Sequence, residues 1–246
     1  MRQDRVVVIT GAAGGIGSAL VDRFLAHQDT VIATGRTLES LEKLRSERSA
    51  SAKLIIAACD ISKEEDCRRL ASVIREQVGR VDVLVNCAGF FPLTPFEDMS
   101  TAEWRQIIDI NLTGVFLMTK AMLPLMRGRG WGRIVNIGSG SVYEGVPAQT
   151  HYVSAKAGVV GLSKCLAREL GAHGITVNIV TPGLTVTAPV LKHLAGLLES
   201  QVQSRAIKRD EQPEDLVGAV FFLASPDAGF ISGQNLNVDG GKYMPS

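Results

Sequence analysis

The chain has 246 residues, of which 46% are hydrophobic and 21% charged, so its composition is not that of a disordered polypeptide. Its 26 basic and 25 acidic residues give a formal net charge of +1. This balance argues against nucleic-acid binding and against a polybasic membrane anchor. The length suits one α/β domain, and we expect a single domain over residues 1–246.

The first residues lead directly into an apolar strand pattern and lack the core of a signal peptide. No apolar run reaches the roughly 18 residues that span a bilayer. The four cysteines (Cys59, Cys67, Cys87 and Cys165) have no paired spacing, and the histidines form no spaced metal pair. We therefore expect a cytoplasmic protein with no disulfide, no metal site, no membrane contact and no nucleic-acid partner.

Short, nearly all-apolar runs predict strands that are covered on both faces, as in a parallel sheet. These runs are Arg5–Thr10, Thr30–Thr34, Lys53–Ala58, Val81–Val85, Arg133–Ile137, Thr176–Val180 and Asn235–Val238. The stretches between them predict helices over Ile16–Ala26, Leu38–Arg48, Glu64–Val78, Thr101–Met126, Tyr152–Ala172 and from Pro213 to near Ala224. The alternation predicts a doubly wound α/β sheet, which residues 185–212 fit least well.

A glycine-rich loop joins the first predicted strand to the first helix. Residues 10–17 follow the spacing Thr-Gly-x-x-x-Gly-x-Gly. Glycine permits the tight turn and lets the backbone approach a pyrophosphate, which the N-terminus of the following helix attracts. An ordinary βα turn is the alternative, but the position at the first strand favours nucleotide binding.

The end of the second predicted strand indicates which nucleotide is bound. An acidic residue there would bind the ribose hydroxyls of NAD. Instead, residues 34–37 carry one charged side chain, Arg36, and the first acid after it is Glu39. Because a guanidinium can bind a 2′-phosphate, the sequence favours NADP(H). If Arg36 is only a solvated loop residue, NAD(H) remains possible.

Tyr152 and Lys156 are spaced i, i+4 and share one face of a predicted helix. Ser139 lies just after the fifth predicted strand, and Asn86 follows the fourth. Because ligands bind at the carboxyl ends of parallel strands, these polar side chains indicate a catalytic site rather than a surface pair.

These motifs resemble the short-chain dehydrogenase/reductase family over essentially the whole chain. The resemblance rests on the glycine loop, the Asn-x-Ala-Gly segment at 86–89, Asn111, Ser139, Tyr152-x-x-x-Lys156, Pro182-Gly183 and the Val-Asp-Gly-Gly segment at 238–241. Cys87 departs from the pattern, since the family usually has a second Asn there. The resemblance implies a Rossmann-like sheet of about seven strands and an NAD(P)-dependent oxidoreductase.

The resemblance also implies roles for the catalytic residues. Tyr152 would exchange a proton with the substrate oxygen, its pKa lowered by the positive charges of Lys156 and an oxidised nicotinamide. Ser139 would hydrogen-bond that oxygen, Lys156 would hold the nicotinamide ribose, and Asn111 would position a water. The other expected cofactor contacts are Gly11, Gly14, Gly15, Ile16, Gly17, Arg36, Asp60, Ile61, Asn86, Ala88, Gly89, Pro182, Gly183, Thr185 and Thr187. Asp60 could bind the adenine amino group or cap the next helix with Ser62.

Residues 185–212 correspond to the family's variable lid over the substrate. The expected substrate contacts are Phe91, Ser141, Tyr143, Gln149 and Leu184. They indicate an apolar or aromatic alcohol or ketone. Residues 91–96, 130–133 and 150–152 resemble bacterial secondary-alcohol dehydrogenases of the 1-phenylethanol kind, which are commonly NAD-dependent.

A second resemblance is to 3-oxoacyl-acyl-carrier-protein reductases, which use NADPH. Arg36 fits that group, and Arg127 and Arg129 could meet an acidic carrier protein. A non-catalytic NADP(H)-binding regulator on the same fold is an alternative of another class. Family resemblance further implies a homotetramer or homodimer.

Overall fold

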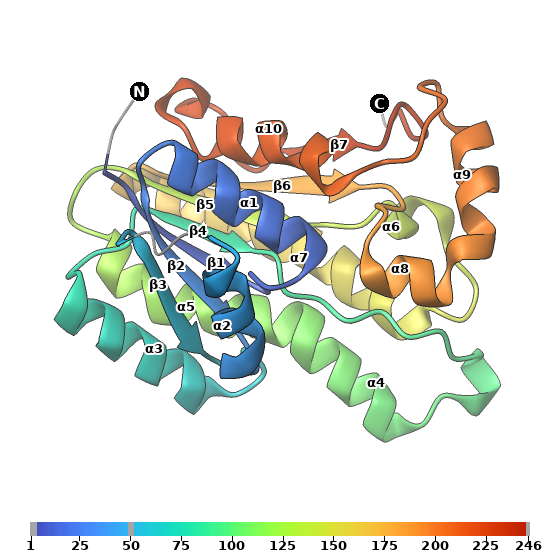
Figure 1. The fold of residues 1–246 in the computed structure, drawn as a ribbon, viewed down its shortest axis with the longest axis horizontal. Helices are drawn as coiled ribbons and strands as arrows, with labels where there is room; N and C mark the ends of the chain where they lie inside the picture. Colours follow the sequence, from blue (N-terminus) through green and yellow to red (C-terminus); the bar gives the residue numbers. More distant parts are fainter. Residues whose placement is uncertain (1–3, 49–51, 245–246) are drawn as a thin grey trace.

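The computed structural model describes residues 4–48 and 52–244. One parallel sheet with the order β3-β2-β1-β4-β5-β6-β7 forms its centre (Figure 1). The strands are β1 (Val6–Thr10), β2 (Thr30–Gly35), β3 (Leu54–Ala58), β4 (Val83–Asn86), β5 (Gly132–Ile137), β6 (Ile175–Pro182) and β7 (Asn235–Val238). The order reverses between β1 and β4, which is the topological switch point where ligands bind in open α/β sheets. The Rossmann-like prediction is therefore confirmed.

Alternate residues of each strand point to opposite faces of the sheet and fill two separate cores. Val7 and Ile9 of β1 lie in the core covered by α1, α2 and α10, whereas Val6 and Val8 lie in the core covered by α3, α5 and α7. These helices are α1 (Gly15–Ala26), α2 (Leu38–Ser46), α3 (Glu64–Gln77), α5 (Gly114–Met126), α7 (Thr150–Leu170) and α10 (Pro213–Leu223). Helices on both faces explain why the strands are almost entirely apolar.

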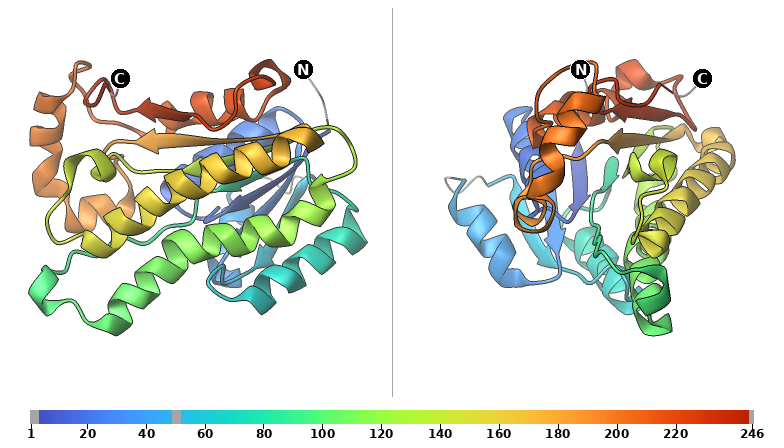
Figure 2. Two further views of the ribbon diagram at one scale, coloured as in Figure 1. Left: turned by 180° about the vertical axis from the view of Figure 1, so that it is seen from behind. Right: turned by 90° about the vertical axis from the view of Figure 1, so that its right-hand side faces the viewer.

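The helix predicted over Thr101–Met126 is interrupted in the structure. It consists of α4 (Thr101–Ile108), the π-helical turn η2 (Asp109–Thr113) and α5. Such π turns are frequent at functional sites, and Asn111 lies at the centre of this one. Figure 2 shows the combined helix running alongside α7.

By length and mean hydropathy, Thr101–Met126 could also cross a membrane. However, Met118 and Met122 of α5 are fully buried in the core beneath the sheet. The same segment contacts α3 and α7. These contacts are those of a core helix in a globular protein.

Residues 185–212 contain short helices and no strand of the main sheet. They form α8 (Ala188–His193), the 3₁₀ turn η4 (Ala195–Leu197) and α9 (Leu198–Ser204), which stand at one end of the sheet (Figure 1). A further short helix, α6 (Ser141–Glu144), follows β5. These segments surround the carboxyl ends of β5 and β6.

Candidate active site

The glycine loop between β1 and α1 needs its glycines for steric reasons. Gly11 has φ +64°, and a Cβ there would lie 2.7 Å from the Cα of Ala88. A Cβ on Gly17 would clash with the carbonyl oxygen of Gly11, and one on Gly15 would lie 2.7 Å from the Thr187 methyl. The loop therefore packs directly against segments that follow β4 and β6.

The N-terminus of α1 is suited to an anion. Its N-cap residue, Gly14, makes no side-chain cap, and the first turn holds no acidic residue. The N–H groups at the start of this helix are therefore available to a phosphate, and the helix dipole favours it. These features fit the dinucleotide that the sequence predicts.

Arg36 is exposed just beyond the end of β2. The main-chain oxygen of Gly35 accepts a hydrogen bond from Cys59 N–H (2.8 Å), which places Arg36 beside the end of β3. The Asp60 carboxylate accepts hydrogen bonds from the amide (3.1 Å) and hydroxyl (2.6 Å) of Ser62. These bonds lie in the turn before α3, whose N-cap residue, Lys63, makes no side-chain cap. Asp60 therefore holds this turn rather than capping the helix, and its contact with adenine stays a prediction.

The segment after β4 is held by buried polar side chains. The Thr10 hydroxyl accepts hydrogen bonds from the amides of Cys87 and Ala88, both at 3.0 Å. The Asn86 side chain is buried and donates to Asn136 Oδ1 at 2.8 Å. Asn86, which was predicted to contact the cofactor, thus holds β4 and β5 together through its side chain.

Asn111 links the π turn to the loop after β4. Its Nδ2 donates to the carbonyl oxygens of Phe90 (2.8 Å) and Ile107 (3.0 Å), and its Oδ1 accepts from Phe90 N–H (3.2 Å). The side chain is fully buried. Its amide therefore fixes the path of the loop that carries Gly89 and Phe91.

Ser139, Tyr152 and Lys156 converge beside the ends of β5 and β6. Ser139 lies beside Tyr152, close enough for its hydroxyl to act on the pKa of the phenol. Lys156 Nζ donates to the Ile137 carbonyl oxygen (2.8 Å) and lies 5.8 Å from the centre of the Tyr152 ring. Ser139 Oγ also lies 2.7 Å from Ser141 Oγ. The structure thus brings together the serine that follows β5 and the tyrosine and lysine of α7, as the sequence predicts.

The expected lowering of the Tyr152 pKa is not produced by the protein's own groups. Burial raises the pKa of Tyr152 to about 12, although the neighbouring Ser139 hydroxyl opposes this shift. Burial also lowers the pKa of Lys156 to about 8. At neutral pH the phenol is therefore protonated and able to donate.

A cavity of about 210 Å³ runs from the start of α1 to Tyr152. Its lining is mainly apolar and includes Val146, Val190 and Leu194. The predicted site residues that line it are Ile16, Gly89, Phe91, Ser139, Ser141, Gln149, Tyr152, Lys156, Pro182, Gly183, Leu184, Thr185 and Thr187. The predicted site residues outside this lining are Gly11, Gly14, Gly15, Gly17, Arg36, Asp60, Ile61, Asn86, Ala88, Asn111 and Tyr143.

Tyr143 is the substrate contact that the structure places elsewhere. Its ring packs on Tyr243, with 5.7 Å between the ring centres, and its hydroxyl accepts from Asn235 Nδ2 at 2.8 Å. Because Asn235 belongs to β7, Tyr143 is turned toward that strand, and it does not line the cavity. Tyr243, near the C-terminus, lines the cavity instead. No local motif marks Tyr243, because only the tertiary fold brings it there.

Phe91 stands next to the expected proton donor. The centres of the Phe91 and Tyr152 rings are 5.9 Å apart, and both rings line the cavity. The phenol therefore meets substrate in a pocket with one aromatic wall. Such a wall suits a flat apolar group next to the reacting oxygen.

Three comparisons agree with this arrangement. A family model described as "Enoyl-(Acyl carrier protein) reductase" matches residues 11–242. The chain is 37% identical over 246 residues to a 3-oxoacyl-[acyl-carrier-protein] reductase of Haemophilus influenzae, covering 98% of this chain and 99% of the relative.

Two solved structures have the same fold. One is a short-chain dehydrogenase/reductase, a glucose/ribitol dehydrogenase from Brucella melitensis, with a TM-score of 0.94, 31% identity and coverage of 99% of this chain and 98% of that one. The other is levodione reductase, with a TM-score of 0.92, 31% identity and 98% coverage of both chains.

Proposed function

Because this chain belongs to the short-chain dehydrogenase/reductase family, we propose that it interconverts apolar or aromatic ketones and secondary alcohols, with NADP(H) as the preferred cofactor. The chain is an oxidoreductase of the ketoreductase type. The observation that carries the substrate proposal is the convergence of Ser139, Tyr152 and Lys156 on one largely apolar cavity. That intact set also argues against the non-catalytic regulator.

The proposed mechanism uses the protein's side chains for proton transfer and orientation. The bound nicotinamide supplies or accepts the hydride at the carbonyl carbon. Ser139 donates a hydrogen bond to the substrate oxygen, and Tyr152 gives that oxygen its proton in reduction or removes it in oxidation. Lys156, charged below its pKa of about 8, stabilises the phenolate that remains. Because the pKa of Tyr152 is raised to about 12, the phenol is protonated at neutral pH, which is the state that reduction requires.

The pH dependence of the reaction rates should follow the ionisation of Lys156 and Tyr152. We expect kcat/KM for ketone reduction to fall as pH rises through about 8, because Lys156 loses its charge there. Alcohol oxidation should instead gain with pH, since it requires a deprotonated Tyr152. Initial rates from pH 6 to 10 in both directions test this expectation. Lys156→Arg, which stays charged, should lose the alkaline decline, and a wild-type profile that is flat across pH 8 would contradict the assignment.

The NADP(H) preference is proposed from Arg36. Its guanidinium is exposed beyond β2, and the first acid after it, Glu39, lies in the first turn of α2. We expect Arg36→Asp to shift the ratio of kcat/KM for NADPH over NADH by about 10–100-fold toward NADH, because a charge-assisted hydrogen bond is replaced by repulsion.

Arg45→Asp is the matched control for this charge change. Arg45 is exposed in the last turn of α2, so its replacement should leave the cofactor ratio unchanged. Equal ratios for wild-type protein and Arg36→Asp would remove the basis for the NADP(H) proposal.

The substrate proposal competes with reduction of a carrier-bound 3-oxoacyl chain. The Haemophilus influenzae relative is named a 3-oxoacyl-[acyl-carrier-protein] reductase. Arg127 is exposed and fits an acidic partner, but Arg129 holds an ion pair with the buried Asp82. Rates with an aryl ketone and with a 3-oxoacyl carrier protein separate the two proposals. A higher kcat/KM for the carrier-bound substrate would favour the second.

We further propose a cytoplasmic homotetramer or homodimer. Exposed apolar side chains gather along α10, the turn after it and β7, the outer strand of the sheet: Phe222, Phe230 and Leu236. Phe116 is another exposed aromatic side chain, on α5. Exposed apolar groups of this kind support contact with a second copy. Light scattering after size-exclusion chromatography measures the assembly directly.

A further inference from the structure

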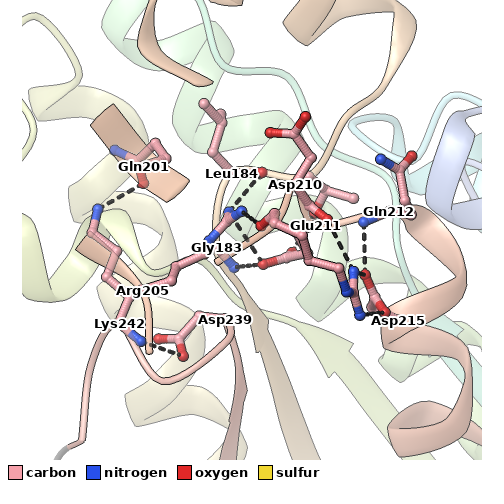
Figure 3. A network of polar contacts seen from close by, with 12 residues as sticks. Gly183, Leu184, Gln201, Arg205, Asp210, Glu211, Gln212, Asp215, Asp239 and Lys242 are labelled. Carbon is pink, nitrogen blue, oxygen red and sulfur yellow. Dashed lines mark hydrogen bonds and ion pairs between the residues drawn. The ribbon is translucent and has the colours of Figure 1, made fainter. Parts of the chain in front are cut away.

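A buried carboxylate outside the expected catalytic group holds the segment that follows β6. Glu211 precedes α10 and is only 5% exposed. Figure 3 shows it pointing at Gly183 and Leu184, in the loop that lines the cavity beside the catalytic side chains. A carboxylate in such a place requires compensating partners, because burying an unpaired charge is costly.

Both oxygens of this carboxylate bind the loop after β6. Oε1 accepts a hydrogen bond from the Thr185 hydroxyl at 2.6 Å, and Oε2 accepts one from Gly183 N–H at 3.1 Å. The main-chain oxygen of Glu211 accepts a third bond, from Val186 N–H at 2.8 Å. One residue thus fixes the loop at three points: Gly183, Thr185 and Val186.

Arg205 completes the arrangement from the end of α9. Its Nη2 donates to the Leu184 carbonyl oxygen at 2.9 Å and lies 3.6 Å from Glu211 Oε2. Its Nη1 donates to the carbonyl oxygen of Arg209 at 3.0 Å. The guanidinium is 2% exposed and therefore neutralises the carboxylate out of water.

Close packing leaves this pair little freedom. A Cβ on Gly183 would lie 2.7 Å from Glu211 Oε2, and one on Gly240 would lie 3.2 Å from Arg205 Cδ. Burial raises the pKa of Glu211, while Thr185 and Arg205 oppose that rise. The carboxylate is thus held by the loop on one side and by the guanidinium on the other.

We propose that Glu211, neutralised by Arg205, is a positioning residue that fixes residues 183–186 in the conformation that receives the nicotinamide end of the cofactor. This inference rests on the proposed nicotinamide-dependent function. It assigns no chemistry to Glu211, which acts through the loop.

The test compares the two ends of the cofactor. Glu211→Gln keeps the size of the side chain but leaves one oxygen for two donors, so one bond to the loop is lost. We expect the dissociation constant of NADPH, measured by its fluorescence, to rise about tenfold. Binding of 2′,5′-ADP, which lacks the nicotinamide end, should remain unchanged. If NADH binds more tightly than NADPH, the comparison of NADH with ADP replaces that of NADPH with 2′,5′-ADP.

Matched variants separate positioning from a general loss of structure. Glu214→Gln makes the same chemical change at an exposed position in the first turn of α10 and should leave both affinities unchanged. Thr185→Val, which deletes the hydroxyl that Glu211 accepts from, should weaken NADPH alone, and Thr185→Ser should restore its binding. These two variants carry the test if Glu211→Gln fails to fold.

Two results would overturn the proposal. Equal weakening of NADPH and 2′,5′-ADP would show a purely structural role, and unchanged NADPH binding in Glu211→Gln and Thr185→Val would show no role. Wild-type protein that binds NADPH but reduces no ketone would contradict the proposed substrate, and the binding comparison would still decide the role of Glu211. Wild-type protein that binds neither nicotinamide cofactor would overturn both proposals.

Discussion

Tyr152→Phe should lower kcat for ketone reduction by about 10²–10⁴-fold, the usual contribution of a general acid. The substitution removes the phenolic proton but keeps the ring that packs 5.9 Å from Phe91. The cavity should therefore keep its shape, and the dissociation constant of NADPH should be largely unchanged. Steady-state rates and a fluorescence titration on the same preparation measure the two quantities.

Tyr143→Phe is the control for this substitution. It also deletes a phenolic hydroxyl, but Tyr143 packs on Tyr243 and hydrogen-bonds Asn235 outside the cavity. We expect its kcat to match that of the wild-type protein. Retained turnover in Tyr152→Phe would contradict the assignment of the proton donor.

Gly17→Ala should have the second large effect, on the glycine loop. The added Cβ would clash with the Gly11 carbonyl oxygen and lie 2.8 Å from the Cα of Ala12. Both neighbours are backbone and cannot move aside as a side chain would. We expect the free energy of unfolding to fall by about 1–3 kcal/mol, as for other overpacked sites. Cofactor affinity should fall with it, because the displaced loop forms the proposed phosphate site.

Gly161→Ala is the corresponding control in α7. Among the residues that the structure describes, no atom lies within 4 Å of a Cβ built there, so the substitution meets open space. Alanine is favoured over glycine in a helix by about 1 kcal/mol, and stability should therefore be equal or higher. Urea denaturation of both variants measures the difference. A Gly17→Ala protein as stable as wild type, with normal cofactor affinity, would show that the loop tolerates a side chain.

The fold could be predicted from sequence because each face of the sheet is covered. That covering makes the strands apolar runs, and β1 shifts by only one residue, from a predicted start at Arg5 to Val6. The main difference between prediction and structure concerns Thr101–Met126, which was predicted as one unbroken helix. Apolar periodicity does not distinguish an α-helix from one that contains a single π turn, so the turn at Asn111 was not predicted.

The site could be predicted only where its residues form short motifs. Tyr152 and Lys156 lie one helical turn apart, and the glycine loop lies within eight residues. Glu211, Arg205 and Tyr243 carry no local signal, because their partners are distant in sequence and are met only in the folded protein. The position of Tyr143 outside the cavity lining could not be predicted for a related reason, since the direction of a side chain on α6 depends on how that short helix is turned.

The surroundings of His151, the residue before Tyr152, were also not predicted from the sequence. It is fully buried, its Nδ1 accepts from the Tyr152 amide (2.8 Å), and its Nε2 lies 3.5 Å from Glu103 Oε1. This burial is that of a packing residue, which lies between α7 and Glu103 of α4.

Transfer of deuteride from NADPH labelled at the nicotinamide C4 tests the central claim most directly. The wild-type protein, incubated with the labelled cofactor and an aryl ketone, should give a secondary alcohol with one deuterium on the carbinol carbon. Tyr152→Phe should give almost none in the same time. An alcohol that stays unlabelled with both C4 epimers of the labelled cofactor would contradict the proposed ketone reduction. The absence of any alcohol product from the wild-type protein would contradict it as well.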